Sequence, residues 1–352
     1  MLYFSILFLL GLIALKTKGN VQLYLSIALL LLMMLLCGLR SPYVGADTIR
    51  YVEFAEGYDT SDRFGSLFFA VRDFLYLHGF RASGILLSFA ILTYLPLVFV
   101  IYKESKLPAL AVLIYMTATC HFFLETFNIV RQEMALSYLL LSLFCYTQES
   151  KVYKFSSILF YLIAVSCHTI IIIALPFVLM LRVRVSRNFV IAAVILSIFI
   201  GYMGADLFIS RFVNLLGEIT IVDGSYYNRY ADNTHNVNWG FLGTLSHWLP
   251  LSLLCVGSYS NKGNTVYYNF FLIGTIMTNL LISNKFCDRI ASVFTIAVIL
   301  YIPQIYNSIH GESRKIVIIS IFIFCFTYIY GLLSLVLHPE AGNVIPYSFY
   351  FQ

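Results

Sequence analysis

Arginines that interrupt or border apolar stretches are the side chains of this sequence best suited to chemistry. Arg131 follows Asn128 and precedes Gln132, directly before a long apolar stretch. A guanidinium group is planar and permanently charged, and it forms paired hydrogen bonds with phosphate oxygens. Ionisable side chains within membrane segments are costly and usually functional. The residues predicted to bind a phosphate or diphosphate are Arg131, Arg289, Arg40, Asn128 and Gln132.

Helix starts are expected beside several of these positions. Asn128, Thr169 and Asp288 are candidate N-caps for the apolar runs that follow them. The first amide groups of a helix are free and carry the positive end of its dipole, so a helix start attracts anions. The arginines and the helix starts together predict an anion site, and in the outer leaflet the expected anion is a lipid phosphate or diphosphate.

The same residues also have structural interpretations. Arg131 is close enough in sequence to Glu125 and Glu133 for an ion pair, and Arg289 fits an ordinary loop residue. His168 lies between two apolar runs and fits a packing histidine. The sequence leaves these alternatives open. The histidines expected to form helix–helix hydrogen bonds within spans are His121 and His247.

The composition is that of an integral membrane protein. The chain has 352 residues, of which 60% are hydrophobic and only 11% are charged, and its mean hydropathy is +0.86. Soluble domains carry about 25% charged residues. We predict one all-α membrane domain over residues 1–352 with 10–12 membrane segments, some of them short or broken. The apolar runs are 2–15, 21–39, 83–102, 109–124, 129–147, 155–167, 169–181, 189–204, 239–257, 266–283, 290–309 and 316–337.

The lysines predict the orientation of these segments. With twelve spans and the N-terminus outside, eight of the nine lysines fall in short inner loops, which is the positive-inside arrangement. A break near His168 is part of this prediction, because one continuous span there would move Arg182, Arg184 and Arg187 outside.

This orientation places two long loops outside the membrane, at about 40–82 and 205–238. They hold most of the acidic residues and many tyrosines. Aromatic faces with amide and carboxylate groups suit sugar rings, and an interfacial aromatic belt is the alternative. The residues predicted to bind sugar are Tyr226, Tyr227 and Arg229.

No cofactor motif is present in the sequence. HExxH, P-loop and GxSxG patterns are missing, the seven cysteines form no CxxC pair, and no outward cluster of acids has metal-ligand spacing. We expect metal-free chemistry without a cofactor, and no nucleic-acid partner.

The sequence resembles the EpsG-type branch of the Wzy polysaccharide polymerases, and four places carry the likeness. The first is Arg40 with the run 44–48 and Tyr51, and the most specific is NIVRQEMA at 128–135. The others are His168 after a short apolar run and the tail Ile345-Pro346-Tyr347. The sequence departs from the family pattern on both sides of His168, at Cys167 and Thr169-Ile170, and after Arg289-Ile290, at Val293-Phe294.

The resemblance implies a fold like that of GT-C-type membrane glycosyltransferases and a reaction at the outer face of the bacterial cytoplasmic (inner) membrane. The enzyme would polymerise repeat units carried by undecaprenyl diphosphate into O-antigen, capsule or exopolysaccharide, with inversion at the anomeric carbon. Arg131, Arg289 and Arg40 would neutralise the diphosphate, and His168, or Asp47 in its place, would be the base. Donor and acceptor glycolipids, membrane lipid and a chain-length regulator are the partners implied.

Two other functions fit the same residues. A flippase or exporter of the lipid-linked sugar would also place arginines in a cavity, although the internal repeats common in transporters are missing here. An O-antigen ligase would use the same arginine and histidine chemistry.

Overall fold

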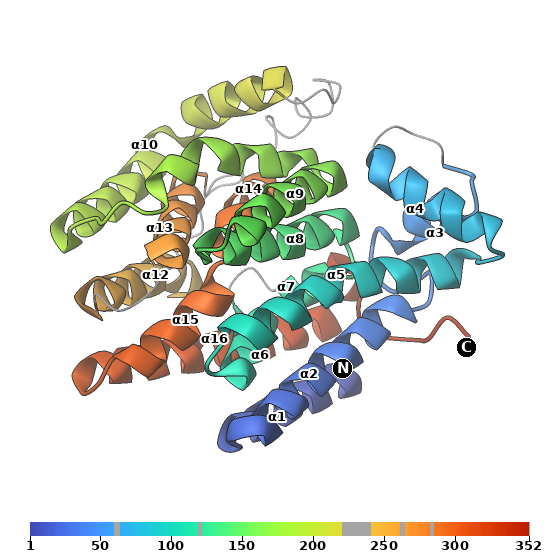
Figure 1. Ribbon diagram of the computed structural model, residues 1–352, viewed down its shortest axis with the longest axis horizontal. Helices are drawn as coiled ribbons and strands as arrows, with labels where there is room; N and C mark the ends of the chain where they lie inside the picture. Colours follow the sequence, from blue (N-terminus) through green and yellow to red (C-terminus); the bar gives the residue numbers. More distant parts are fainter. Residues whose placement is uncertain (60–63, 119–121, 220–240, 261–264, 282–284, 352) are drawn as a thin grey trace. The chain divides into compact units, whose positions relative to one another are not determined.

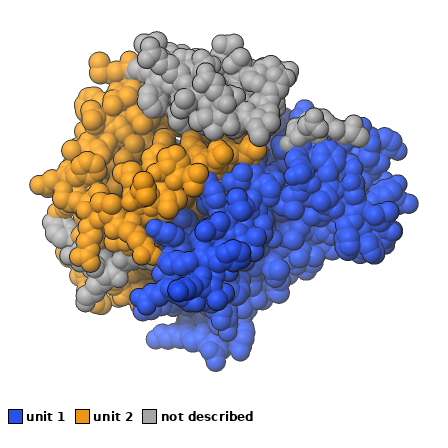
Figure 2. All heavy atoms as spheres, turned by 45° about the horizontal axis from the view of Figure 1, so that its top comes forward, with its two compact units in different colours: residues 1–168, 321–352 blue, residues 169–320 orange. Residues whose placement is uncertain are grey.

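The computed structural model describes the chain except for residues 60–63, 119–121, 220–240, 261–264, 282–284 and 352. The described part is built from helices (Figure 1), and its only β-type pairing is a bridge between Arg40 and Phe349. The described parts of the twelve predicted apolar runs lie largely on helix, so the all-α prediction is confirmed. The chain divides into two compact units, coloured separately in Figure 2, and each is described by itself.

The first unit comprises Met1–His168 and Ile321–Gln352. Helix α5 contacts α2 and α8, and α8 contacts α9 along its length. The helices of this unit are α1 (Leu2–Lys16), α2 (Gly19–Gly38), α3 (Thr48–Ala55), α4 (Gly65–Leu77), α5 (Ala82–Glu104), α6 (Pro108–Thr117), α7 (Phe122–Glu125), α8 (Val130–Thr147), α9 (Lys151–Cys167) and the later part of α16 (Glu312–Leu337).

The second unit spans Thr169–Ser320, and α13 is its centre. Helix α13 contacts α10, α12, α14 and α15. Its helices are η2 (Thr169–Met180, a 3-10 helix), α10 (Arg187–Ile219), α12 (Phe241–Ser260), α13 (Thr265–Leu280), α14 (Lys285–Thr295), α15 (Val298–Ser308) and the first part of α16. The predicted break near His168 is confirmed, because α9 ends at Cys167 and η2 begins at Thr169.

Among the residues that the structure describes, four helical segments are long and apolar enough to cross a membrane: Gly19–Gly38, Ala82–Glu104, Arg289–Ser308 and Glu312–Leu337. Shorter apolar helices are found at Leu2–Lys16, Pro108–Thr117, Thr169–Met180 and Arg187–Met203. A helix of 10–17 residues is shorter than the roughly 20 residues that span hydrocarbon. The chain is therefore a multi-pass helical membrane protein, and the count of 10–12 segments stays a prediction.

The segment 40–82, predicted as a loop, contains the two helices α3 and α4. Their apolar side chains recur at helical spacing and are covered by other aromatic rings. The rings of Phe54 and Phe64 stack with centroids 4.0 Å apart, and Phe68 of α4 lies 4.6 Å from Phe89 of α5. The acidic and tyrosine content of the segment gave no sign of these two short helices, and its extracytoplasmic location stays a prediction. Similarly, α10 continues to Ile219, into the second predicted loop.

A buried polar network joins three helices of the second unit. His247 Nδ1 lies 2.6 Å from Asn279 Oδ1, and Asn279 Nδ2 donates to Ser197 Oγ at 2.9 Å. All three side chains are at most 3% exposed. The network links α12, α13 and α10, so the predicted helix–helix role of His247 is confirmed.

Replacing Asn279 by alanine is expected to destabilise the second unit by about 1–3 kcal/mol, because it removes the buried hydrogen bonds of Asn279 with His247 Nδ1 and Ser197 Oγ. Thr278→Ala is the matched control, since the Thr278 hydroxyl donates only to Gly274 O of its own helix. Thermal unfolding in detergent should show a larger fall in Tm for N279A. Equal Tm values for the two variants would contradict this role of the network.

Candidate functional site

Arg131, in the first turn of α8, is partly exposed and has no ionic partner. Its guanidinium carbon lies 5.5 Å from the centre of the Phe64 ring. Within the described residues the guanidinium makes no ion pair or hydrogen bond, so the predicted alternative of a pair with Glu125 or Glu133 is wrong there. A cation–π contact leaves hydrogen-bond donors of the guanidinium free. Arg131 therefore offers an open cation at the start of a helix.

The start of α8 is held by side chains far away in the sequence. The N-cap is Ile129, without a side-chain cap bond, so the prediction of Asn128 as N-cap is wrong. The Asn128 Oδ1 atom instead accepts a hydrogen bond from the Ala46 amide at 2.6 Å. The Arg131 amide donates to the Tyr51 hydroxyl at 3.4 Å, and the Tyr51 ring packs edge-on against Phe64.

Arg40 lies beneath this region and is 0% exposed. Its Nε donates to Thr48 Oγ1 at 2.9 Å, and Nη1 donates to the Cys37 carbonyl. The guanidinium also lies over the Phe127 ring, at 5.7 Å, and only its Nη2 atom has no partner. In this structure Arg40 ties the end of α2 to the start of α3 and to the turn before α8.

Gly45 and the C-terminal tail complete the same junction. The Gly45 amide donates to Asn343 O at 2.7 Å, and the Tyr347 hydroxyl donates to Leu36 O at 2.7 Å. Gly45 has φ +94°, and a Cβ there would lie 2.3 Å from Phe127 O. The three short motifs quoted from the sequence, at 40–51, 128–135 and 345–347, therefore meet in one place.

Asp47 lies at the edge of this junction, directly before α3. Its carboxylate is 3.6 Å from Arg50 Nη1, and its side chain is 39% exposed. It makes no cap bond to α3. Asp47 is therefore accessible and weakly paired, because an exposed ion pair of this length contributes little.

The antiparallel packing of α8 and α9 brings His168, which follows the end of α9, to the same end of the helix pair as Arg131. Ser142 and Ser157 exchange hydrogen bonds at 2.7 and 2.9 Å, and the rings of Tyr138 and Phe160 are in contact nearer the start of α8. This is an antiparallel pair, so the start of α8 faces the end of α9, where His168 follows as C-cap. The side chain of His168 is half-buried.

The start of helix α4 lies near both the start of α8 and the end of α9. The Phe64 ring makes the cation–π contact with Arg131, and Phe64 directly precedes Gly65. A Cβ added at Gly65 would lie 3.4 Å from the Ser166 carbonyl oxygen, near the end of α9. The start of α4 thus connects the surroundings of Arg131 with the end of α9. Sequence reasoning missed Phe64, because an aromatic residue in a presumed loop gives no signal of its own.

The remaining predicted residues are placed differently. Gln132 is 1% exposed, which puts it in the helix interface. Arg289 is half-buried in α14 of the second unit, so its convergence with Arg131 stays a prediction. Asp288 lies inside α14, which begins at Lys285, so its prediction as an N-cap is wrong. The sugar-binding prediction falls outside the described residues, as it concerns Tyr226, Tyr227 and Arg229.

A family model describes nearly the whole chain. The model of the EpsG family matches residues 23–349. The chain belongs to the EpsG family. No solved structure and no functionally curated protein matches it. EpsG proteins are membrane proteins of the polysaccharide-polymerase type, and the matched range includes Arg40, Asp47, Arg131, His168 and Arg289.

Gly45→Ala is expected to destabilise the first unit by about 1–3 kcal/mol more than Gly57→Ala, because its Cβ overlaps the Phe127 carbonyl as well as straining a left-handed backbone. Gly57 is the matched control: it has φ +83° but no atom within 4 Å of an added Cβ. Thermal unfolding of both variants measures the difference. Equal losses of stability would show that the close approach at Gly45 contributes nothing.

Proposed function

We propose that this EpsG-family chain is a membrane glycosyltransferase that joins oligosaccharide repeat units carried on a polyprenyl diphosphate such as undecaprenyl diphosphate. The unpaired guanidinium of Arg131 supports this most directly. A family of polymerase type needs a group that neutralises the departing diphosphate, and an open arginine at a helix start suits that task. The site is assigned to the outer face of the bacterial cytoplasmic membrane by the distribution of lysines.

The reaction needs a cation and a base, and no further group. The acceptor hydroxyl oxygen attacks the anomeric carbon of the donor sugar, and the bond from that carbon to the diphosphate oxygen breaks. The electron pair leaves with the diphosphate, where Arg131 stabilises the charge. The hydroxyl proton passes to His168, or to Asp47 in its place. Direct displacement through an oxocarbenium-like transition state inverts the anomeric carbon.

The other predicted residues take supporting roles in this proposal. Arg289 supplies a second guanidinium to the diphosphate. Arg40, being fully buried, positions the segment that carries Asp47 and Tyr51. Asn128 fixes the turn before α8 through the Ala46 amide. The tyrosines at 226 and 227, with Arg229, are proposed to contact sugar.

Replacing Arg131 by glutamine is expected to lower polymerisation about 100-fold, because one charge-stabilising donor of a transition state is lost. Arg81→Gln is the matched control, since Arg81 also rests on an aromatic ring, 4.7 Å from the centre of Tyr76. Surface glycan length in cells is the readout, with membrane insertion confirmed for both variants.

R131Q should leave single repeat units on the surface anchor, while R81Q should retain full-length glycan. A flippase defect would leave no glycan on the anchor, and a ligase defect would leave finished polymer on the lipid carrier. Either of these patterns, or unchanged glycan in R131Q, would refute the polymerase assignment of Arg131.

His168→Gln is expected to remove the acidic limb of the pH–rate profile. An imidazole base works only when it is neutral, so the wild-type rate is expected to fall as the pH drops and the imidazole becomes protonated. Purified protein with a lipid-linked substrate gives the profile, and D47N serves as the comparison. If H168Q keeps the acidic limb of the wild-type profile and D47N loses it, the base is Asp47 and not His168.

A further inference from the structure

A cavity of about 100 Å³ lies within the second unit, and none of the described residues that line it takes part in the proposed reaction. It is lined by the connection between η2 and α10, the last turn of α12, the first two turns of α13, and Tyr301 and Ile305 of α15. Its polar lining is Arg184, Ser258, Thr265, Tyr268 and Asn269. A water molecule takes about 30 Å³, so the space is large enough for a phosphate group and a few further atoms.

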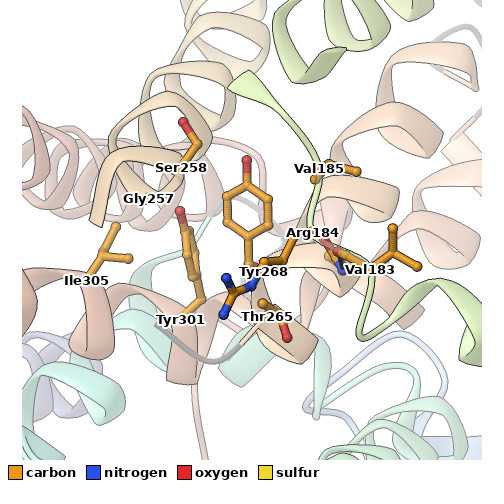
Figure 3. A pocket seen from close by; sticks show the side chains of 10 residues that line it. Val183, Arg184, Val185, Gly257, Ser258, Thr265, Tyr268, Tyr301 and Ile305 are labelled. Carbon is orange, nitrogen blue, oxygen red and sulfur yellow. Dashed lines mark hydrogen bonds between the residues drawn. The ribbon is translucent and has the colours of Figure 1, made fainter. Parts of the chain in front are cut away.

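Arg184, an exposed residue of the connection between η2 and α10, brings a positive charge to the rim of this cavity. Figure 3 shows its guanidinium directed into the space beside Tyr301, Tyr268 and Thr265. Within the described residues Arg184 forms no ion pair or hydrogen bond through its side chain. Thr265 is the first residue of α13, whose free amide groups and dipole add to the positive potential. Both features favour an anion.

Two buried polar atoms on the lining have no partner. The hydroxyl of Tyr268 and the Oδ1 atom of Asn269 are both buried without a hydrogen bond, and Asn269 is only 4% exposed. The orientation of the Asn269 amide is fixed, because its Nδ2 donates to the carbonyls of Met180, Leu181 and Val183 at 2.7–3.0 Å. The Oδ1 atom of Asn269 is therefore a buried acceptor that a hydrogen-bond donor of the ligand could satisfy.

The ligand must satisfy both demands at once. A bare anion would suit Arg184 and the start of α13 but would leave the Asn269 acceptor unpaired. A phosphate ester with a neighbouring hydroxyl supplies the negative charge and the donor together.

We propose that this cavity binds a glycerol-phosphate-like group, as a phospholipid headgroup or as a soluble phosphate ester. The predicted orientation places the connection at 182–187 and the loop with Lys262 on the cytoplasmic side. The site therefore belongs to the inner surface, and its ligand is a lipid or metabolite of that side. It binds independently of the glycosyl-transfer residues.

The experiment uses the full-length protein in two kinds of nanodisc. In phosphatidylcholine discs, binding of added sn-glycerol 3-phosphate is titrated. In discs that mix phosphatidylcholine with phosphatidylglycerol, native mass spectrometry counts retained phosphatidylglycerol. Saturable binding in the first arm identifies a soluble ester, and selective retention in the second identifies a lipid headgroup.

Arg184→Gln and Tyr268→Phe test the cavity, and Arg314→Gln is the matched control. Arg314 is another arginine of this unit on the predicted cytoplasmic side, and it rests on the Tyr306 ring at 4.4 Å, outside the lining. R184Q is expected to weaken binding about tenfold or more, and Y268F several-fold, while R314Q leaves it unchanged. No binding in either arm, or equal losses in R184Q and R314Q, would overturn the proposal.

Discussion

An arginine without a counter-ion at the start of a membrane-protein helix is the constraint on which the first unit depends. The Arg131 guanidinium rests on the Phe64 ring, and within the described residues no carboxylate neutralises it. A cation–π contact stabilises a charge by about 0.5–2 kcal/mol, which is less than full compensation in a low-dielectric setting. The positive potential is therefore retained for a ligand. The surrounding contacts fix the place where that potential is felt.

Arg40 and Arg131, both in the first unit, have different roles, one structural and one chemical. Arg40 is fully buried and uses its donors on Thr48 and Cys37, so it joins segments that are distant in the sequence. Arg131 makes no such bonds and stays open. Two hydrogen bonds attach the C-terminal tail to the same junction. The Gly45 amide donates to Asn343 O, and the Tyr347 hydroxyl donates to Leu36 O. The motifs at 40–51, 128–135 and 345–347 thus pack together and position the guanidinium of Arg131.

The sequence was sufficient for features that depend on local composition. Apolar length predicted the helices found in the described parts of the twelve runs, and the break at His168 followed from the placement of the basic residues. It was insufficient where partners come from far along the chain. Asn128 bonds to Ala46 rather than capping α8, while Thr169 and Asp288 lie inside η2 and α14, so all three capping predictions were wrong. The helices α3 and α4 also escaped prediction because their stability comes from aromatic contacts such as Phe54 with Phe64.

The most direct measurement of the central claim is the affinity of purified protein in nanodiscs for a polyprenyl diphosphate, compared with the matching monophosphate. An open guanidinium at Arg131 predicts saturable binding that prefers the diphosphate and weakens about tenfold or more when Arg131 is replaced by glutamine. Undiminished diphosphate affinity in the R131Q protein would contradict the account.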